Sequence, residues 1–424
     1  MFHWRDIMQS LIYKIAASRG ATKIMQVKQL KFLFLLIFCF SHSVLAEADF
    51  PSIPPTSTPP LSTAIPKAPA LSVKSFILID FLSDQIIAEQ GVDERAEPAS
   101  LTKMMTIYVA DQALKHNKIK LNDKVKISEK AWRASGSRMF LQVNTEVAVE
   151  DLLKGIIIQS GNDASIALAE HIAGDESAFA QFMNYYAAEL GMTNTHFENA
   201  TGLPDPNHYT TAKDMATLGK ALIRDFPESY ALYSQKEYVY QNIKQTNRNR
   251  LLWKHDWVDG IKTGHTESAG FCLVASGIQD GMRLIAVIMG AKNDGIRTDE
   301  TNQLLTYGFR FYETRKLYPK ALRLAETRVW MGKTNEIGLG LAEDLYVTLG
   351  RGLHDRLKSN ISVNKTIKAP ILEGAVLGTL TVQLDDQTLL EKPIVALQAV
   401  PEANIFSRAY DYIVLSVKSL WNRD

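Results

Sequence analysis

A serine and a lysine three positions apart are the first residues in this 424-residue chain whose types and spacing suggest catalysis. Ser100 and Lys103 follow Pro98 in a segment that predicts a helix over 97–111, with the proline near its beginning. Residues three apart share one face of a helix, so the hydroxyl and the amine can meet. A serine hydroxyl needs a base to take its proton before it attacks well. A lysine can be that base when burial or a nearby cation lowers its pKa.

Ser160-Gly161-Asn162 forms a second motif between the apolar run 156–158 and a following helical pattern. The hydroxyl of Ser160 can relay a proton toward a leaving group, and the amide of Asn162 can hold a substrate carbonyl. This motif therefore predicts groups that serve the second half of an acyl-transfer reaction.

Lys262-Thr263-Gly264 forms a third motif at the end of a predicted strand. A cation at Lys262 would help to keep Lys103 neutral and would attract a substrate carboxylate. Gly264 would let a substrate backbone approach the strand edge. The backbone N–H groups of His265 and Ser100 could together form an oxyanion hole, worth roughly 3–4 kcal/mol per donor.

Each motif alone carries little weight, because a lone Ser-x-x-Lys, Ser-Gly-Asn or Lys-Thr-Gly is usually an ordinary helix start or turn. Here the three motifs follow one another along the chain in the order given, and each falls on the kind of element that its role requires. The set resembles the one found in penicillin-binding proteins and β-lactamases. The sequence therefore predicts a serine acyl-transfer site.

The elements that must position these motifs can be read from the hydrophobic pattern. Segments 75–80 and 86–88 flank a turn and predict a hairpin, and 100–222 is mainly helical in pattern. Segments 258–261, 271–275 and 284–288 predict neighbouring antiparallel strands. We therefore expect an α/β (α+β) catalytic domain over 71–316, with helices on the faces of an antiparallel sheet.

The chain before this domain has the composition of an export signal and a spacer. Lys28 and Lys31 precede an apolar run and small residues ending at Ala46, which predicts a signal peptide over 1–46, with Met25 as an alternative start. An uncleaved anchor is the other interpretation. Seven prolines punctuate the following stretch and predict an extended linker over 47–70.

The chain after the catalytic domain predicts two further parts. Short strands at 345–349, 380–384 and 394–397 indicate a small all-β domain over 317–402, in which no catalytic constellation is found. In 403–424 the apolar residues repeat at helical spacing and form one face: Phe406, Ala409, Tyr410, Ile413, Val414, Val417, Leu420 and Trp421. Such a helix lies either in a membrane interface or against the protein itself.

Composition excludes some classes of partner. The net charge is +1, so nothing suggests nucleic acid. The two cysteines are Cys39, in the predicted signal, and Cys272, so the mature chain would hold one thiol and no internal disulfide.

The segments around the three motifs, together with Asn247–Trp253, resemble the low-molecular-mass D-alanyl-D-alanine carboxypeptidases of the penicillin-binding protein 5 type. The resemblance implies that Ser100 attacks the D-Ala-D-Ala bond of a peptidoglycan stem peptide and releases D-alanine, and that β-lactams acylate the same serine. It implies no metal or organic cofactor. It also implies an exported protein held at the periplasmic face of the inner membrane by its terminal helix.

By the same resemblance, Arg248 and Arg297 would arrange the substrate carboxylate with Thr263, and Asp225 would support Arg248 from behind. One departure concerns the segment 131–141, which looks shorter than in the penicillin-binding protein 5 type and would border the site.

Other functions on the same fold stay open at this point. A β-lactamase needs a carboxylate that activates water for deacylation, and Glu198 is the one tempting candidate. A peptidoglycan endopeptidase and a non-catalytic cell-wall scaffold are further alternatives, although a scaffold would have had no need to keep Ser100, Lys103 and Lys262.

Overall fold

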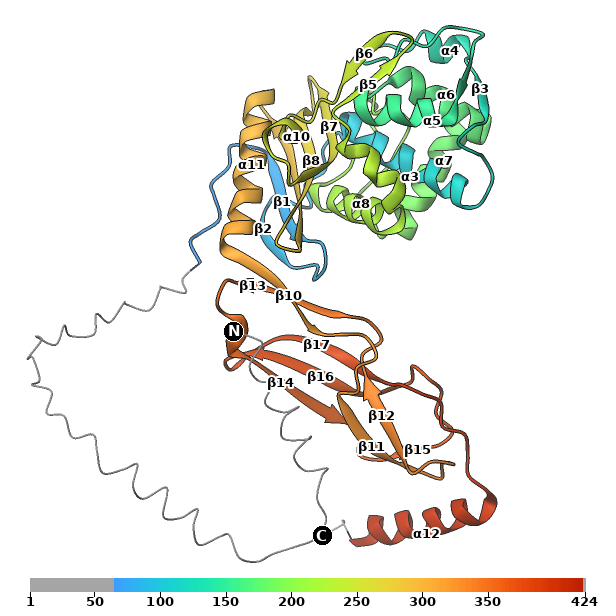
Figure 1. Cartoon of the computed structure of the whole chain (residues 1–424), viewed down its shortest axis with the longest axis vertical. Coiled ribbons are helices and arrows are strands. Elements are labelled where there is room, and N and C mark those ends of the chain that lie inside the picture. Colours follow the sequence, from blue (N-terminus) through green and yellow to red (C-terminus); the bar gives the residue numbers. More distant parts are fainter. Residues whose placement is uncertain (1–64, 422–424) are drawn as a thin grey trace, which may run out of the picture. The chain divides into compact units, whose positions relative to one another are not determined.

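The computed structural model describes residues 65–421, with side chains to residue 418. The predicted signal peptide and residues 47–64 of the predicted linker lie outside the described residues. The first part of the fold is built on a five-stranded antiparallel sheet (Figure 1). Its strands, in spatial order, are β2 (Ile86–Gln90), β1 (Ser75–Asp80), β9 (Met282–Ala291), β8 (Gly270–Gln279) and β7 (Val258–Thr266).

Alternation along the strands divides the apolar side chains between two cores. In β8, Cys272 and Val274 belong to the core on the helical side, whereas Leu273 and Ala275 belong to the core beneath α11 (Asp294–Phe311). This follows from the two-residue period of a strand, because successive side chains point to opposite faces. The predicted hairpin and the three predicted strands are confirmed, and both faces of the sheet are covered.

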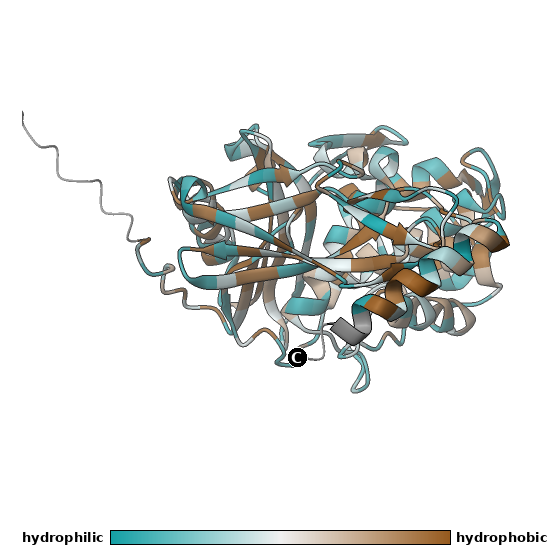
Figure 2. Ribbon diagram, turned by 90° about the horizontal axis from the view of Figure 1, so that it is seen from below, coloured by the Kyte–Doolittle hydropathy of each residue, from teal (hydrophilic) through white to brown (hydrophobic). Residues whose placement is uncertain are grey.

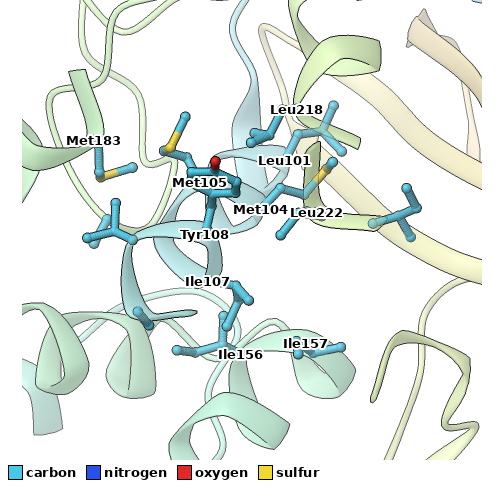
Figure 3. Packing of buried hydrophobic residues seen from close by; sticks show 14 of the residues in the cluster. Leu101, Met104, Met105, Ile107, Tyr108, Ile156, Ile157, Met183, Leu218 and Leu222 are labelled. Carbon is cyan, nitrogen blue, oxygen red and sulfur yellow. The ribbon is translucent and has the colours of Figure 1, made fainter. Parts of the chain in front are cut away.

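The helical block packs around one central helix, α3 (Thr102–Lys115), which is buried on all sides from Thr102 to Asp111. A helix without a solvated face belongs at the centre of a domain. Figure 3 shows Met104, Ile107 and Tyr108 among residues from the neighbouring helices. The other helices of the block are α4 (Glu129–Trp132), α5 (Val149–Lys154), α6 (Asn162–Ala173), α7 (Glu176–Glu189), α8 (Ala212–Asp225), α9 (Pro227–Tyr230) and α10 (Leu251–Lys254).

Short elements complete the catalytic part. Two hairpins pair β3 (Lys124–Lys126) with β4 (Glu146–Ala148), and β5 (Glu237–Tyr240) with β6 (Ile243–Thr246). Single turns form η1 (Ala99–Leu101), η2 (Gly155–Gln159) and η3 (Ala231–Ser234). The predicted helix over 97–111 therefore begins two residues later, as a 3₁₀ turn, and continues to Lys115.

The predicted β-rich part has its own hydrophobic core. A six-stranded sheet contains, in spatial order, β14 (Leu357–Val363), β16 (Val376–Leu384), β17 (Gln387–Ala396), β12 (Glu336–Gly340), β11 (Ala325–Trp330) and β15 (Ile367–Lys368). A separate pair joins β10 (Tyr312–Tyr318) to β13 (Leu345–Gly350), and η4 (His354–Arg356) is a single turn. Alternate residues such as Leu380 and Val382 are buried, as the strand pattern predicts.

The chain ends in the helix α12 (Ile405–Trp421), whose apolar residues are visible in Figure 2. Its exposed side chains include Phe406, Tyr410 and Ile413, which are 84%, 67% and 61% exposed. Asp411, on the opposite side, is buried and accepts a hydrogen bond of 2.6 Å from the backbone N–H of Met331. Thus the side of α12 that carries Asp411 packs on the β-rich part, where Val414 and Leu415 are half-buried, and the apolar side chains named above stay exposed. No helix in residues 65–421 combines the length and apolar character that crossing a bilayer requires.

Candidate active site

Ser100 and Lys103 meet at the start of the central helix. Ser100 lies in η1 and is half-buried, whereas Lys103 lies in the first turn of α3 and is fully buried. The Lys103 Nζ atom is 3.2 Å from the Ser100 Oγ atom. The i, i+3 spacing predicted this contact, and the structure brings the two groups together.

Lys103 has two further contacts, and both are shorter. Its Nζ atom donates 2.6 Å hydrogen bonds to the Asn162 Oδ1 atom and to the Thr201 backbone oxygen. A neutral amine has two N–H donors and one lone pair. Two obligate acceptors therefore use both donors, which leaves the lone pair for the Ser100 hydroxyl proton.

The electrostatic environment favours this neutral form. The pKa of Lys103 is lowered from 10.5 to about 7, first by burial and then by the positive charge of Arg248, whereas Asp163 and Glu176 act in the opposite direction. The cation that the sequence suggested for this task was Lys262. In the structure, burial is the first cause and Arg248 is the cation that lowers the pKa of Lys103.

The second motif is held by an unusual backbone turn. The π-helical turn η2 ends at Ser160, whose φ of 64° and ψ of 38° are left-handed. Only glycine, and sometimes asparagine or aspartate, adopts this conformation at little cost, so the surrounding fold must hold Ser160 there. The turn allows the Ser160 Oγ atom to accept a 2.9 Å hydrogen bond from Lys262 Nζ.

Asn162 holds parts of the protein itself. Its Oδ1 atom accepts from Lys103, and its Nδ2 atom donates to the Ser135 backbone oxygen at 2.7 Å. The next residue, Asp163, accepts hydrogen bonds from the backbone N–H groups of Met139 and Leu141 at 2.9 and 3.1 Å. The start of α6 therefore holds both the base and the loop that borders the site. The expected contact between Asn162 and a substrate carbonyl stays a prediction.

The third motif lies on an edge strand. Among the described strands, β7 pairs with β8 alone, which leaves its other edge without a strand partner, as a site for an extended peptide requires. Lys262 is buried, and burial followed by the charges of Lys103, Arg248 and Arg297 holds its pKa well below the ordinary value. A side chain at Gly264 would lie 3.0 Å from the Pro98 backbone oxygen. Gly264 thus allows η1 to pack closely against β7.

A cavity of about 700 Å³ joins these parts. Seven of the predicted site residues line it, while Lys103, Asn162 and Lys262 lie behind its wall. The seven are Ser100, Ser160, Arg248, Thr263, Gly264, His265 and Arg297. The loop residues Gly136 and Ser137 also line the cavity, which places the segment 131–141 at the site as expected.

The arginines in the cavity differ in their partners. Arg297 is buried and paired with Asp294, and Arg250 also binds Asp294, at 2.7 Å. Arg248 has no ion-pair or hydrogen-bond partner in residues 65–418. Its loop is fixed by Asn249, whose Nδ2 atom donates a 2.8 Å hydrogen bond to the Gly260 backbone oxygen.

The expectation for Asp225 is wrong, and Glu198, the carboxylate that a β-lactamase would have needed, is not at the site. Asp225 does not support Arg248; it binds Arg224 at 2.6 Å and Tyr108 at 2.9 Å, and it lines a different cavity. Glu198 lies 3.3 Å from His196 and does not line the catalytic cavity. The partner of Asp225 is Arg224, its neighbour in sequence on the same helix, α8.

Several contributing groups had no usable sequence signal. The Thr201 backbone oxygen is independent of side-chain type, and Arg250 and Asp294 are ordinary surface residues by pattern. In the part of the chain with described side chains, no group of three or more His, Cys, Asp or Glu residues could hold a metal ion.

Comparisons with known proteins cover both parts of the fold. A family model described as D-alanyl-D-alanine carboxypeptidase matches residues 62–293, and one described as penicillin-binding protein 5, C-terminal domain, matches 312–402. The D-alanyl-D-alanine carboxypeptidase DacC of Escherichia coli (strain K12) is 45% identical over 357 residues, which are 82% of this chain and 89% of the relative.

Solved structures are similar as well. Penicillin-binding protein 5 from Haemophilus influenzae matches with a TM-score of 0.77 and 41% identity, over 80% of this chain and all of the other. Penicillin-binding protein D2 from Listeria monocytogenes, in its cefotaxime-bound form, matches with a TM-score of 0.54 and 27% identity, over 57% of this chain and all of the other.

Proposed function

The chain belongs to the D-alanyl-D-alanine carboxypeptidase family and is a serine-type D-Ala-D-Ala carboxypeptidase, and we propose that Ser100 is its nucleophile and Lys103 its general base. The substrate would be the D-Ala-D-Ala end of a peptidoglycan stem peptide. The observation that carries this assignment is the hydrogen bonding of Lys103 Nζ. The Asn162 amide oxygen and the Thr201 backbone oxygen accept both N–H groups of a neutral amine.

In the acylation step, the Ser100 Oγ atom attacks the carbonyl carbon of the terminal peptide bond, and its proton moves to the lone pair of Lys103. The carbonyl oxygen gains negative charge, which the backbone N–H groups of Ser100 and His265 would stabilise. Both residues line the cavity, so both can contact a bound carbonyl.

The departing nitrogen of D-alanine must gain a proton as the peptide bond breaks. Ser160 is suited to supply it, because its hydroxyl lines the cavity and accepts a hydrogen bond from Lys262. Ser160 then regains a proton from Lys103, which becomes neutral again. Water attacks the ester carbonyl carbon and gives a proton to Lys103, which passes it to the Ser100 Oγ atom as the ester bond breaks. This second step restores the free enzyme and releases the shortened peptide.

A terminal carboxylate identifies the substrate end, and Arg248 is the guanidinium best suited to bind it. Asp294 already neutralises Arg297, whereas Arg248 is unpaired among the described residues and lines the same cavity as Thr263. A guanidinium and a hydroxyl together can hold both oxygens of a carboxylate. Arg297 would then act mainly by shaping the wall.

β-Lactams are proposed to acylate the same serine, because the related Listeria protein is solved with cefotaxime. The test combines labelling by a fluorescent penicillin with mass spectrometry of a peptide ending in D-Ala-D-Ala. Wild type should take the label and shorten the peptide by one alanine. Ser100→Ala, Lys103→Ala and Lys262→Ala should do neither while unfolding cooperatively like wild type. Equal labelling of Ser100→Ala would refute the nucleophile, and normal activity of either lysine variant would remove that lysine from the mechanism.

We further propose that the protein is exported and that α12 holds it on a membrane surface. The helix turns Asp411 and Lys418 toward the β-rich part, with Lys418 Nζ 5.2 Å from the ring centre of Trp330. Its exposed apolar side chains then remain available to lipid. A helix that existed only to pack on the protein would bury these side chains instead.

Vesicle flotation tests the anchor with matched charges. Ile413→Glu places a charge on the exposed apolar side, and Ser407→Glu places the same charge on an exposed position outside it. Wild type and Ser407→Glu should float with anionic phospholipid vesicles, and Ile413→Glu or a chain ending before Ala403 should not. Flotation of the truncated chain would place the tether elsewhere.

A further inference from the structure

A second cavity, of about 710 Å³, lies in the helical block and shares no lining residue with the catalytic cavity. It is bounded by the end of α3, the loop after it, α5, and the turns α9 and η3. Its volume is in the range of small-molecule sites. Much of the wall is aliphatic or aromatic, from Leu114, Ile119, Leu121, Leu153, Phe226 and Leu232.

The polar groups in this wall include two that lack partners. Asp111 is only 3% exposed and lines the cavity, and its Oδ2 atom has no hydrogen-bond partner among the described residues. The buried Oγ atom of Ser229, which also lines the cavity, has no partner at ordinary hydrogen-bond geometry, although it lies near enough to the Asp111 carboxylate to favour its charged form. The hydroxyl of Tyr233 is also unpartnered, and burial, followed by the nearby charge of Asp111, raises the pKa of that phenol. Buried polar atoms are nearly always paired, so three orphans in one place call for a ligand or ordered water.

The remaining charges around the cavity do not neutralise Asp111. Glu150 is paired with Lys154 and Asp225 with Arg224, while Lys115 lies over the ring of Phe226. Lys120 and Glu228 line the cavity, are exposed and carry opposite charges. Burial raises the pKa of Asp111 to about 7, although the hydroxyl of Ser229 acts in the opposite direction. The structure therefore contains a buried acid that lacks a cation.

We propose that this cavity binds a primary alkylammonium group, with the nitrogen at Asp111 and Ser229 and the carbon chain against the apolar wall. An ammonium has three N–H donors and one positive charge, which match the unpartnered oxygens and the missing counter-charge. A neutral alcohol would supply the chain without the charge, and a carboxylate would supply the wrong charge.

Calorimetric titration of the full-length protein tests this with n-pentylamine, 1-pentanol and pentanoate as probes. Pentylamine should bind at least about tenfold more tightly than either of the others. Its affinity should fall as the pH is lowered through 7, because protonation of Asp111 removes the charge that it pairs with. Nα-acetyl-lysine amide carries the same ammonium group on a peptide side chain. Tighter binding of pentylamine would identify the natural ligand as a free amine, and tighter binding of the lysine derivative would identify it as a lysine side chain of a peptide.

Two variants separate the buried acid from general attraction. Asp111→Asn keeps the shape and should lose about tenfold or more in pentylamine affinity, while Glu228→Gln removes an exposed acid from the same cavity and should change it less than about twofold. Both should be labelled by penicillin at the wild-type rate, which shows that the fold is intact. Failure of both amines to bind wild type, equal binding of 1-pentanol, or unchanged affinity in Asp111→Asn would overturn the proposal.

Discussion

Replacing Gly202 by alanine should displace the nucleophile without touching any reacting atom. Gly202 has a φ of +81°, and a Cβ atom there would lie 1.8 Å from the backbone oxygen of Ala99, the residue before Ser100. Gly202 also follows Thr201, whose backbone oxygen accepts a hydrogen bond from Lys103. The substitution is therefore expected to displace both Ser100 and Lys103.

The displacement can be estimated from the contact. Cβ atoms essentially never approach other heavy atoms closer than 3.0 Å, so the two segments must separate by about 1.2 Å. A misplacement of about 1 Å costs on the order of 100-fold in rate. The left-handed conformation itself adds roughly 1–2 kcal/mol of destabilisation.

Gly281→Ala is the matched control, because Gly281 has a φ of +79° and a Cβ atom there would meet nothing within 4 Å. It should lose about the same stability through backbone strain and keep the wild-type rate. The assay is the rate of labelling by a fluorescent penicillin, with thermal unfolding measured for both variants. Equal labelling rates in the two variants would refute the claim that the approach of Gly202 to Ala99 positions Ser100.

Three further predictions concern the protonation of the base and the loop beside it. The labelling rate of wild type should rise with pH through a midpoint near 7, as Lys103 loses its proton; a flat profile would exclude it as the base. Asp163→Asn should lower that midpoint, because the Asp163 carboxylate raises the pKa of Lys103. It should also lower the free energy of unfolding in urea by about 2–3 kcal/mol, because the amide nitrogen that replaces one carboxylate oxygen cannot accept a hydrogen bond from the backbone N–H of Met139 or Leu141. Arg248→Gln should raise the midpoint and weaken the binding of D-Ala-D-Ala peptides, as measured by KM; an unchanged midpoint would contradict the assigned charge effect.

The sequence predicted those parts of the site that depend on local spacing. The three-residue separation of Ser100 and Lys103 implies a shared helical face, and the short apolar segment just before Lys262 implies a strand. Contacts with backbone atoms that are distant in sequence could not be predicted. Nothing in the sequence marks the Thr201 backbone oxygen as an acceptor for Lys103, or the left-handed turn at Ser160.

The prediction for Asp225 failed for a related reason. A carboxylate can be assigned to an arginine from sequence only when the two lie on one element, and Arg224 is such a neighbour. Arg248 lies in a distant loop, so the choice between the two arginines depended on tertiary structure. The β-rich character of the last part was easier to predict, because short strands with buried alternate residues give a repeated signal.

Lowering the pKa of Lys103 so that it can act as a base also lowers the free energy of unfolding. The unfolded chain binds a proton near the ordinary value of 10.5 and the folded chain only near 7, a difference of about 5 kcal/mol against folding below pH 7. The cost shrinks as pH rises from 7 to 10.5, because over this range the unfolded state still binds a proton that the folded state has lost, and rising pH disfavours the state that binds more protons. A typical domain is stable by about 5–15 kcal/mol, so one such lysine takes up a large share. The continuous burial of α3 from Thr102 to Asp111 supplies the apolar contacts that offset it, and the same burial lowers the pKa. The burial of the central helix therefore both stabilises the fold through apolar contacts and lowers the pKa of the lysine at its first turn.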